Sequence, residues 1–114
     1  MAQFTLQSAK QGDVCIIRTQ GYLNDEAGRA IRAACEPAAT QGSVKFVFNF
    51  AESPVINSPG ITELLELSEW LVYERKARLV FVGLKDLHKN VFKVVGLLKL
   101  AAVHETEEAA LAAF

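Results

Sequence analysis

One serine of this chain lies where a side-chain hydroxyl can be chemically modified at a protein surface. Ser58 belongs to the stretch VINSPG at residues 55–60, between an apolar run and an amphipathic pattern that begins at Ile61. Pro59 suits the first position of a helix, and the residue before a proline adopts extended backbone, as a helix N-cap does. The pattern therefore predicts that Ser58 caps the helix with an exposed hydroxyl. A phosphoryl group is tolerated there, because the helix dipole is positive at that end.

No other group of side chains has the spacing of a catalytic or metal site. The sequence lacks a glycine-rich phosphate loop and a dinucleotide-binding fingerprint. His88 and His104 have no second histidine or cysteine at metal-ligand spacing, and no serine or cysteine has a nearby histidine and acid. We therefore expect no metal, no cofactor and no enzymatic activity. A purely structural helix cap is the alternative role for Ser58.

The helix that follows Ser58 has a second candidate feature, a docking patch. Leu67 and Trp70 lie three residues apart and off the main apolar stripe of the helix. Exposed together, they would form an aliphatic and aromatic anchor for a partner protein, unless Trp70 instead covers the edge of the sheet. Acidic residues on the solvent side would form the rim, and these are Glu63, Glu66, Glu69 and Glu74.

Composition limits the class of protein. The chain has 114 residues, of which 51% are hydrophobic and 22% charged, and these values fit one ordinary globular domain. Its net charge of −1 offers no basic surface for nucleic acid or an anionic membrane, and no apolar run is long enough to span a bilayer. The first residues do not resemble a signal peptide, so we expect a cytoplasmic protein in which Cys15 and Cys35 stay reduced.

Strand-like and helical patterns alternate along the chain, which predicts an α/β fold. We expect a mixed, mostly parallel sheet of about five strands flanked by about four helices. Pro37 is expected to end or kink the first helix. In the third helix, Leu87, Val91 and Val95 are expected to face inward. The predicted strands cover residues 4–7, 14–18, 44–50, 78–83 and 102–104, and the predicted helices cover about 25–40, 59–75, 85–95 and 106–114.

The segment FNFAESPVINSPGI at residues 48–61 resembles the signature of the STAS family, specifically the bacterial anti-sigma-factor antagonists. That family typically has Leu-Asp-Leu, a short linker and Ile-Asp-Ser-Ser-Gly-Leu before its second helix. Four further stretches resemble the family in the same order, so we expect residues 1–114 to form a single STAS domain. These are GYLN at 21–24, RLVFVG at 78–83, VGLLKL at 95–100 and ETEEAALAAF at 105–114.

The resemblance implies a binding protein that is switched by phosphorylation. In that family the unphosphorylated antagonist binds an anti-sigma factor that is also a serine kinase, phosphorylation releases it, and a phosphatase restores it. The family's phosphorylated serine corresponds to Ser58 of this sequence, where a phosphate would add nearly two negative charges. The residues expected to bind the partner are Asn24, Asn57, Ser58, Pro59, Gly60, Ile61, Thr62, Glu63, Glu66, Leu67 and Trp70.

Three residues depart from the family signature. Asn57 and Asn49 replace aspartates, which keeps the shape and the hydrogen bonding but loses the charge, and Pro59 follows the serine. The alternative is therefore a STAS module that works without phosphorylation, docked on a transport or signalling complex or bound to a small ligand. The chain is expected to be a monomer or a weak dimer, and the edge strand at 4–7 is one surface through which copies could pair.

Overall fold

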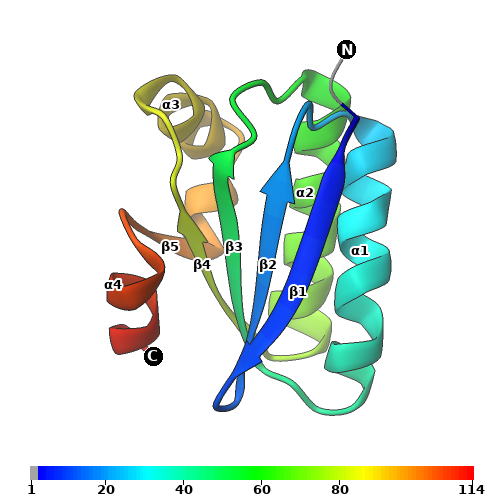
Figure 1. Cartoon of the computed structure of the whole chain (residues 1–114), viewed down its shortest axis with the longest axis vertical. Coiled ribbons are helices and arrows are strands. Elements are labelled where there is room, and N and C mark those ends of the chain that lie inside the picture. Colours follow the sequence, from blue (N-terminus) through cyan, green and yellow to red (C-terminus); the bar gives the residue numbers. More distant parts are fainter. Residues whose placement is uncertain (1–2) are drawn as a thin grey trace.

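A computed structural model describes residues 3–114 of the chain, which form an α/β fold. Five strands lie in one sheet in the order β1-β2-β3-β4-β5 (Figure 1). β1 and β2 are antiparallel, and every other neighbouring pair is parallel. The expected mixed, mostly parallel sheet is therefore confirmed. The strands are β1 (Thr5–Gln11), β2 (Val14–Gln20), β3 (Lys45–Glu52), β4 (Arg78–Val82) and β5 (Ala101–His104).

Four α-helices accompany the sheet, namely α1 (Asp25–Thr40), α2 (Ser58–Glu69), α3 (Asp86–Val94) and α4 (Glu107–Ala112). The π-helical turn η1 (Trp70–Glu74) continues α2, and the 3₁₀ turn η2 (Leu97–Lys99) follows α3. α1 does not end at Pro37, because Ala39 beyond it is buried against the core and the helix runs on to Thr40. β1 is longer than predicted and reaches Gln11, where it meets Val14 of β2.

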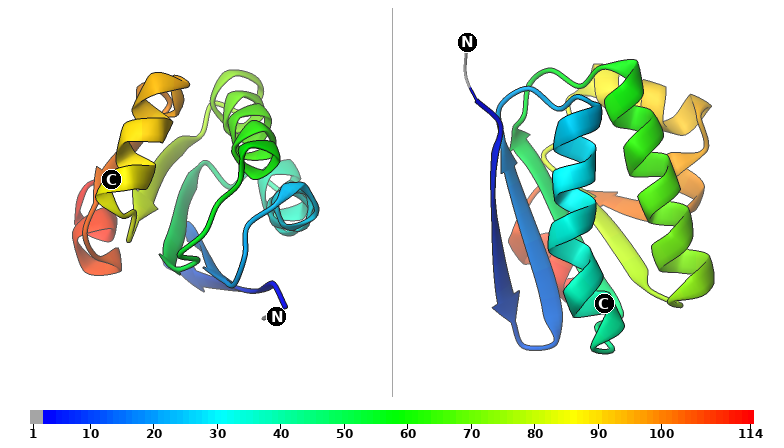
Figure 2. Two further views of the ribbon diagram at one scale, coloured as in Figure 1. Left: turned by 90° about the horizontal axis from the view of Figure 1, so that it is seen from above. Right: turned by 90° about the vertical axis from the view of Figure 1, so that its right-hand side faces the viewer.

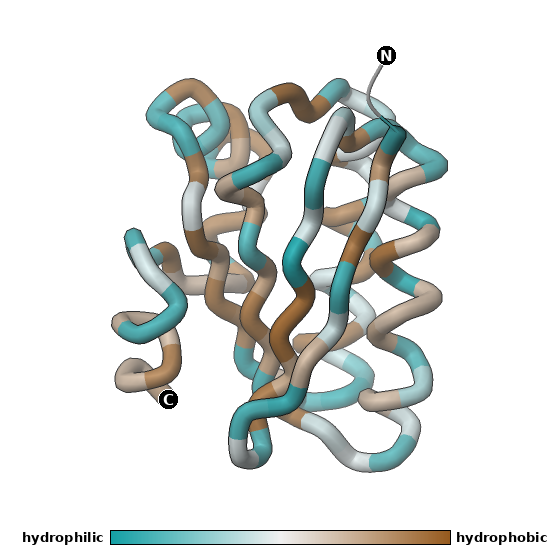
Figure 3. The backbone as a smooth tube through the Cα atoms, viewed as in Figure 1, coloured by the Kyte–Doolittle hydropathy of each residue, from teal (hydrophilic) through white to brown (hydrophobic). Residues whose placement is uncertain are grey.

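α1, α2 and α3 cover one face of the sheet (Figure 2), and aromatic rings fill the space beneath them. Phe46, Phe48 and Phe50 alternate along β3 and stack with ring centroids 6.3 and 6.4 Å apart. Phe81 of β4 and Phe92 of α3 complete the group, with centroids 5.5 Å apart. Apolar residues dominate the middle strands (Figure 3), as expected for parallel strands covered on both faces.

α3 is turned differently from the sequence-based prediction. His88 and Phe92 face the core, whereas Leu87 is 69% exposed, Val95 is 39% exposed and Val91 is half-buried. The expected inward face of Leu87, Val91 and Val95 was therefore wrong. The Phe92 ring buries more apolar surface than a valine, and it packs against both Phe50 and Phe81. That packing fixes the rotation of the helix.

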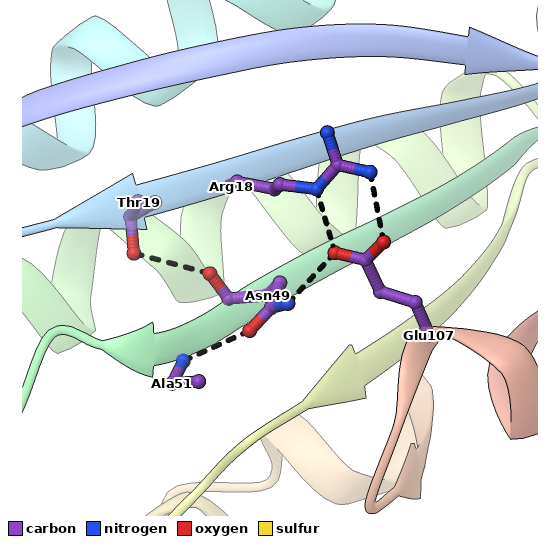
Figure 4. Close-up of polar contacts among 5 residues, drawn as sticks. All are labelled: Arg18, Thr19, Asn49, Ala51 and Glu107. Carbon is purple, nitrogen blue, oxygen red and sulfur yellow. Dashed lines mark hydrogen bonds and ion pairs between the residues drawn. The ribbon is translucent and has the colours of Figure 1, made fainter.

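α4 covers the other face of the sheet, above Val47 and Val80. One polar cluster attaches it to the sheet (Figure 4). Glu107 accepts hydrogen bonds from Arg18 Nε at 2.8 Å, Arg18 Nη2 at 2.9 Å and Asn49 Nδ2 at 2.7 Å. The hydrogen bonds from Arg18 hold the pKa of the Glu107 carboxyl below its ordinary value. Asn49 therefore acts as a donor to a carboxylate, a role that an ionised aspartate does not have.

Candidate functional site

Two loops at one end of the sheet bring the starts of α1 and α2 together (Figure 1). One loop follows β2 and the other follows β3, and a parallel bridge joins them between Leu23 and Ile56. The Leu23 N–H donates to the Val55 carbonyl at 3.0 Å, and the Leu23 carbonyl accepts from the Asn57 N–H at 3.1 Å. Because each loop leads directly into a helix, this bridge fixes the two helix starts relative to one another.

An asparagine caps each of these helices. Asn24 Oδ1 accepts from the Ala27 N–H at 2.9 Å, and Asn57 Oδ1 accepts from the Gly60 N–H at 2.9 Å. Each cap therefore satisfies one of the backbone donors that a helix start leaves without a partner. The Asn57 amide also donates to the hydroxyl of Tyr22 at 2.7 Å, which links the second cap to the first loop.

Ser58 is the first residue of α2 and not its cap, so that part of the prediction was wrong. Asn57 has the extended backbone of an N-cap, with φ −91° and ψ 172°, and its amide oxygen reaches the third helical residue. Pro59 fits inside the first turn, because a donor there has no partner within the helix. Ser58 is exposed, as predicted, and its hydroxyl takes no part in the cap.

The start of α2 differs from the other helix starts in charge. Within residues 3–114, α1 has Asp25 and Glu26 in its first turn, and α3 and α4 have acids there too, whereas α2 has none. Acidic side chains stabilise a helix start through the dipole, so the first turn of α2 can still accept a negative charge. Few backbone N–H groups are free there to bind an anion, however. Pro59 has no N–H, and the Gly60 N–H already donates to Asn57 Oδ1.

Two glycines allow α1 and α2 to approach closely at this end. A Cβ on Gly60 would lie 2.4 Å from the Leu23 carbonyl oxygen, and one on Gly28 would lie 2.4 Å from Cβ of Glu63. Neither obstacle is the free end of a flexible side chain, so any larger residue would push the helix starts apart. The geometry around Ser58 therefore depends on the small size of Gly28 and Gly60.

A surface groove of about 390 Å³ lies beside the Asn24 cap, lined by Phe4, Tyr22, Asn24, Glu26 and Ala27 among others. Sequence reasoning gave Tyr22 no role, although it lies in the GYLN motif one residue before the loop bridge at Leu23. Its hydroxyl supports the Asn57 cap, and its side chain is 37% exposed. Tyr22 is therefore a candidate site residue on geometric grounds.

The predicted partner-binding residues fall into two groups. Leu67 is only 1% exposed, so its expected exposure was wrong. It is buried because α2 packs against both the sheet and α1, which widens the apolar face of the helix. Gly60 is also buried, at the contact with Leu23. Eight of the predicted residues lie at the helix starts, whereas the exposed Glu66 lies in the third turn of α2. These eight are Asn24, Asn57, Ser58, Pro59, Gly60, Ile61, Thr62 and Glu63.

Trp70 is the first residue of η1, directly after α2, and does not form a patch with the buried Leu67. Twelve residues of helix separate it from Ser58, which corresponds to about 18 Å. Its ring packs against the core, with the guanidinium carbon of Arg32 5.7 Å and that of Arg75 6.0 Å from the centroid. Arg75 also donates to the Ala39 carbonyl at 2.8 Å. These cation–π contacts give Trp70 a structural role where η1 packs against α1.

Three other reactive side chains, those of Cys15, Cys35 and His88, are buried. Cys15 and Cys35 are free thiols in the core, and burial raises the pKa of both. His88 is buried too, and burial lowers its pKa. Over residues 3–114, no three His, Cys, Asp or Glu side chains are placed to hold a metal ion. In the same part of the chain, no helix has the length and apolar character needed to cross a membrane.

Residues 5–110 match the family described as the STAS domain. Among solved structures, a putative anti-sigma factor antagonist from Thermotoga maritima superposes with a TM-score of 0.81 at 14% identity, over 95% of this chain and 92% of that one. The anti-sigma factor antagonist SpoIIAA of Bacillus, in its phosphorylated form, gives 0.74 at 23% identity, over 96% and 98%. At these identities the likeness establishes the fold.

A similar domain also occurs inside a larger protein. Murine Slc26a9, an anion transporter, matches with a TM-score of 0.74 at 14% identity over 91% of this chain. The match covers only 18% of the transporter chain. The same fold is therefore found in small antagonists and as one part of a transporter, and the fold by itself does not select between these roles.

Proposed function

We propose that this chain, which belongs to the STAS domain family, is an anti-sigma-factor-antagonist-like regulatory protein. In this proposal the paired starts of α1 and α2 bind an anti-sigma factor that is also a serine kinase, and phosphorylation of Ser58 ends the binding. A phosphatase would restore the binding form. The chain would act as a substrate and binding module in the cytoplasm, and not as an enzyme.

The observation that carries the proposal is that Asn57, and not Ser58, caps α2. Asn57 caps α2, so the Ser58 hydroxyl is exposed and free of a structural role. A kinase could therefore modify Ser58 without removing the cap. The loop bridge and the two glycines hold the surrounding surface in place, so we expect phosphorylation to alter the charge of the surface more than its shape.

The charge of the surface gives the phosphate its expected effect. Glu26 and Glu63 lie in the first two turns of the helices that start beside Ser58, and Glu66 lies one turn further along α2. The partner's contact surface should therefore be positively charged or polar. A phosphate would add nearly two negative charges and a strong hydration shell at a point that docking must dehydrate. The helix dipole at the start of α2 would stabilise the phosphate within this chain. The same phosphate would disrupt a partner contact that fits an uncharged hydroxyl.

Paired variants test the proposal in the organism's own cells. Tagged Ser58→Ala should capture an ATP-binding serine kinase, and Ser58→Glu should capture it at least about tenfold less. Ser8→Glu is the matched control, because Ser8 is an exposed serine on β1. That control should capture the kinase as the unaltered chain does. Equal capture by Ser58→Ala and Ser58→Glu would contradict the proposal.

The uncharged cap residue Asn57 supports a second candidate function. In it, the chain is a STAS module that docks constitutively on a transport or signalling complex. Asn57 offers a kinase no carboxylate beside the hydroxyl, and Pro59 stiffens the segment that the kinase must engage. Asn57→Asp separates the two functions, because an aspartate still caps the helix. Faster phosphorylation of this variant by the captured kinase would favour the switch. Binding that is insensitive to both Ser58 and Asn57 substitutions would favour the constitutive module.

A further inference from the structure

α3 has a stripe of exposed apolar residues on its outer side. Leu87 is 69% exposed and Val94 is 85% exposed, and Val91 between them is half-buried. Residues at positions i, i+4 and i+7 share one face of a helix, so these three side chains form one continuous stripe. The core contacts of α3 are already made by His88 and Phe92 on its other side. A grouped apolar surface of this kind is typical of an interface.

Charged residues beside the stripe have opposite signs at its two ends. Asp86 begins α3 and Lys93 is its penultimate residue. At 100° per residue, both side chains lie on the same side of the stripe, with Asn90 between them. The Asp86 side chain is fully exposed, and Lys89 Nζ lies 4.0 Å from its Oδ1. Asp86 and Lys93 are therefore available to an outside partner.

We propose that α3 is the interface between two copies of this chain. In an antiparallel pair related by a two-fold axis, Leu87 of one copy packs against Val94 of the other, and Val91 lies near the axis. The same arrangement places each Asp86 beside the Lys93 of the other copy, so the charge pair forms twice. This complementarity of the helix with itself identifies a second copy as the occupant. The inference does not rest on the proposed partner switch.

Other occupants fit the surface less well. An acidic protein would meet Asp86 at one end of the stripe, and the nearby Lys89 is already held by Glu105 at 2.9 Å. An anionic membrane favours a longer helix with uniformly basic flanks and bulky anchors. The edge strand β1, the other surface considered for pairing, exposes mainly polar residues such as Gln7 and Gln11. Because α3 is only 9 residues long, its contact area is small. The dimer should therefore be weak, with a dissociation constant above about 1 μM.

Sedimentation equilibrium of the full chain tests the interface, over a range from about 10 μM to about 1 mM. The unaltered chain should form a reversible dimer. Val94→Glu should weaken it by about 100-fold or more, because the carboxylate enters the apolar contact twice. Val44→Glu is the matched control, since Val44 is an apolar residue 42% exposed just before β3. It should dimerise like the unaltered chain, and circular dichroism should show that both variants are folded.

A charge exchange tests the antiparallel register. Asp86→Lys alone and Lys93→Asp alone should each weaken the dimer by about tenfold, because each brings two like-charged pairs together. The double variant should restore most of the affinity. Three results would overturn the proposal: a monomer at every concentration, equal weakening by Val44→Glu and Val94→Glu, or a double variant weaker than both single ones. Binding to vesicles of phosphatidylglycerol without dimer formation would identify a membrane surface instead.

Discussion

The starts of α1 and α2 are built alike but differ in charge. Both follow a parallel strand, both are capped by an asparagine that accepts from the third helical N–H at 2.9 Å, and both loops share the Leu23–Ile56 bridge. α1 then continues with Asp25 and Glu26, whereas α2 continues with Ser58 and Pro59. One helix dipole therefore has permanent negative charges in its first turn, and the other has an exposed hydroxyl.

This difference separates the structural part of the site from the part that we propose to be regulatory. The start of α1 has both stabilising features of a helix N-terminus, because Asn24 caps it and its first turn carries acidic side chains. α2 has the cap but not the charge, and a phosphate on Ser58 would supply that charge at a position where it does not disturb the cap. In the proposed function, Asn24 and Asn57 stabilise the helix starts, and Ser58 is the residue that phosphorylation would modify. Each of the following substitutions tests one part of that assignment.

The largest effect is expected at the glycine contact that holds the two starts together. Gly60→Ala would place a methyl group 2.4 Å from the Leu23 carbonyl oxygen. We expect a loss of about 3 kcal/mol in the free energy of unfolding, measured by urea denaturation. Gly12→Ala is the control, because a Cβ there meets nothing within 4 Å and only the positive φ of 61° opposes it. It should lose about 1 kcal/mol. Equal losses would show that the close approach contributes little.

Removing the caps should have the next largest effect. Asn24→Ala and Asn57→Ala should each lower the free energy of unfolding by about 1 kcal/mol, and Asn57→Ala by somewhat more because it also loses Tyr22. Ser58→Ala should leave stability within about 0.5 kcal/mol of the original. Urea titrations of the three variants would decide the matter. A stable Asn57→Ala beside an unstable Ser58→Ala would make Ser58 the cap after all.

Glu107, the first residue of α4, should make the free energy of unfolding depend on pH. The hydrogen bonds from Arg18 lower the pKa of Glu107 in the folded chain from its ordinary value of 4.5. A carboxyl with a lowered folded pKa stabilises the fold above its unfolded pKa, and this stabilisation is lost as the pH falls through the folded value. Unfolding curves below about pH 4.5 should therefore show a loss of stability that Glu107→Gln lacks. Parallel pH profiles for both chains would refute this role of the Arg18 contact.

The smallest effect is expected from adding a charge to α2. Ser58→Glu should raise the free energy of unfolding by about 0.5 kcal/mol at low salt, and the gain should fade at high salt. Asp25→Asn should cause a loss of similar size in α1, since it removes a charge already there. Thermal melts at two salt concentrations would measure both. A Ser58→Glu variant destabilised by more than about 1 kcal/mol would show that the α2 start does not accept a negative charge.

The sequence predicted the sheet and the two loops that precede α1 and α2 well, because both depend on strong local signals. Continuous apolar runs identified β3 and β4, and the two loops before α1 and α2 carry recognisable turn residues. The cap was misassigned because Asn57 and Ser58 are both good caps and Pro59 is tolerated at either of the first two helical positions. The extended backbone of Asn57 and its hydrogen bond from Gly60 identify it as the cap.

The errors on Leu67 and Leu87 have a different cause, which is tertiary packing. α2 contacts α1 as well as the sheet, so residues beyond its main stripe are buried. α3 has apolar residues on two faces, and the face with Phe92 packs into the core while the face with Leu87 is exposed. The contacts of Tyr22 and the cluster around Glu107 join residues 35 and 89 positions apart. Local sequence patterns cannot predict contacts between residues so far apart in the chain.

The measurement that tests the central claim most directly is intact-mass and phosphopeptide analysis of this protein purified from its own cells under several growth conditions. The account predicts a phosphoryl group on Ser58 whose occupancy changes with conditions, and binding to the serine kinase only in the unmodified fraction. Ser58 without modification in every condition, or a modified fraction that binds the kinase as well as the unmodified one, would contradict it.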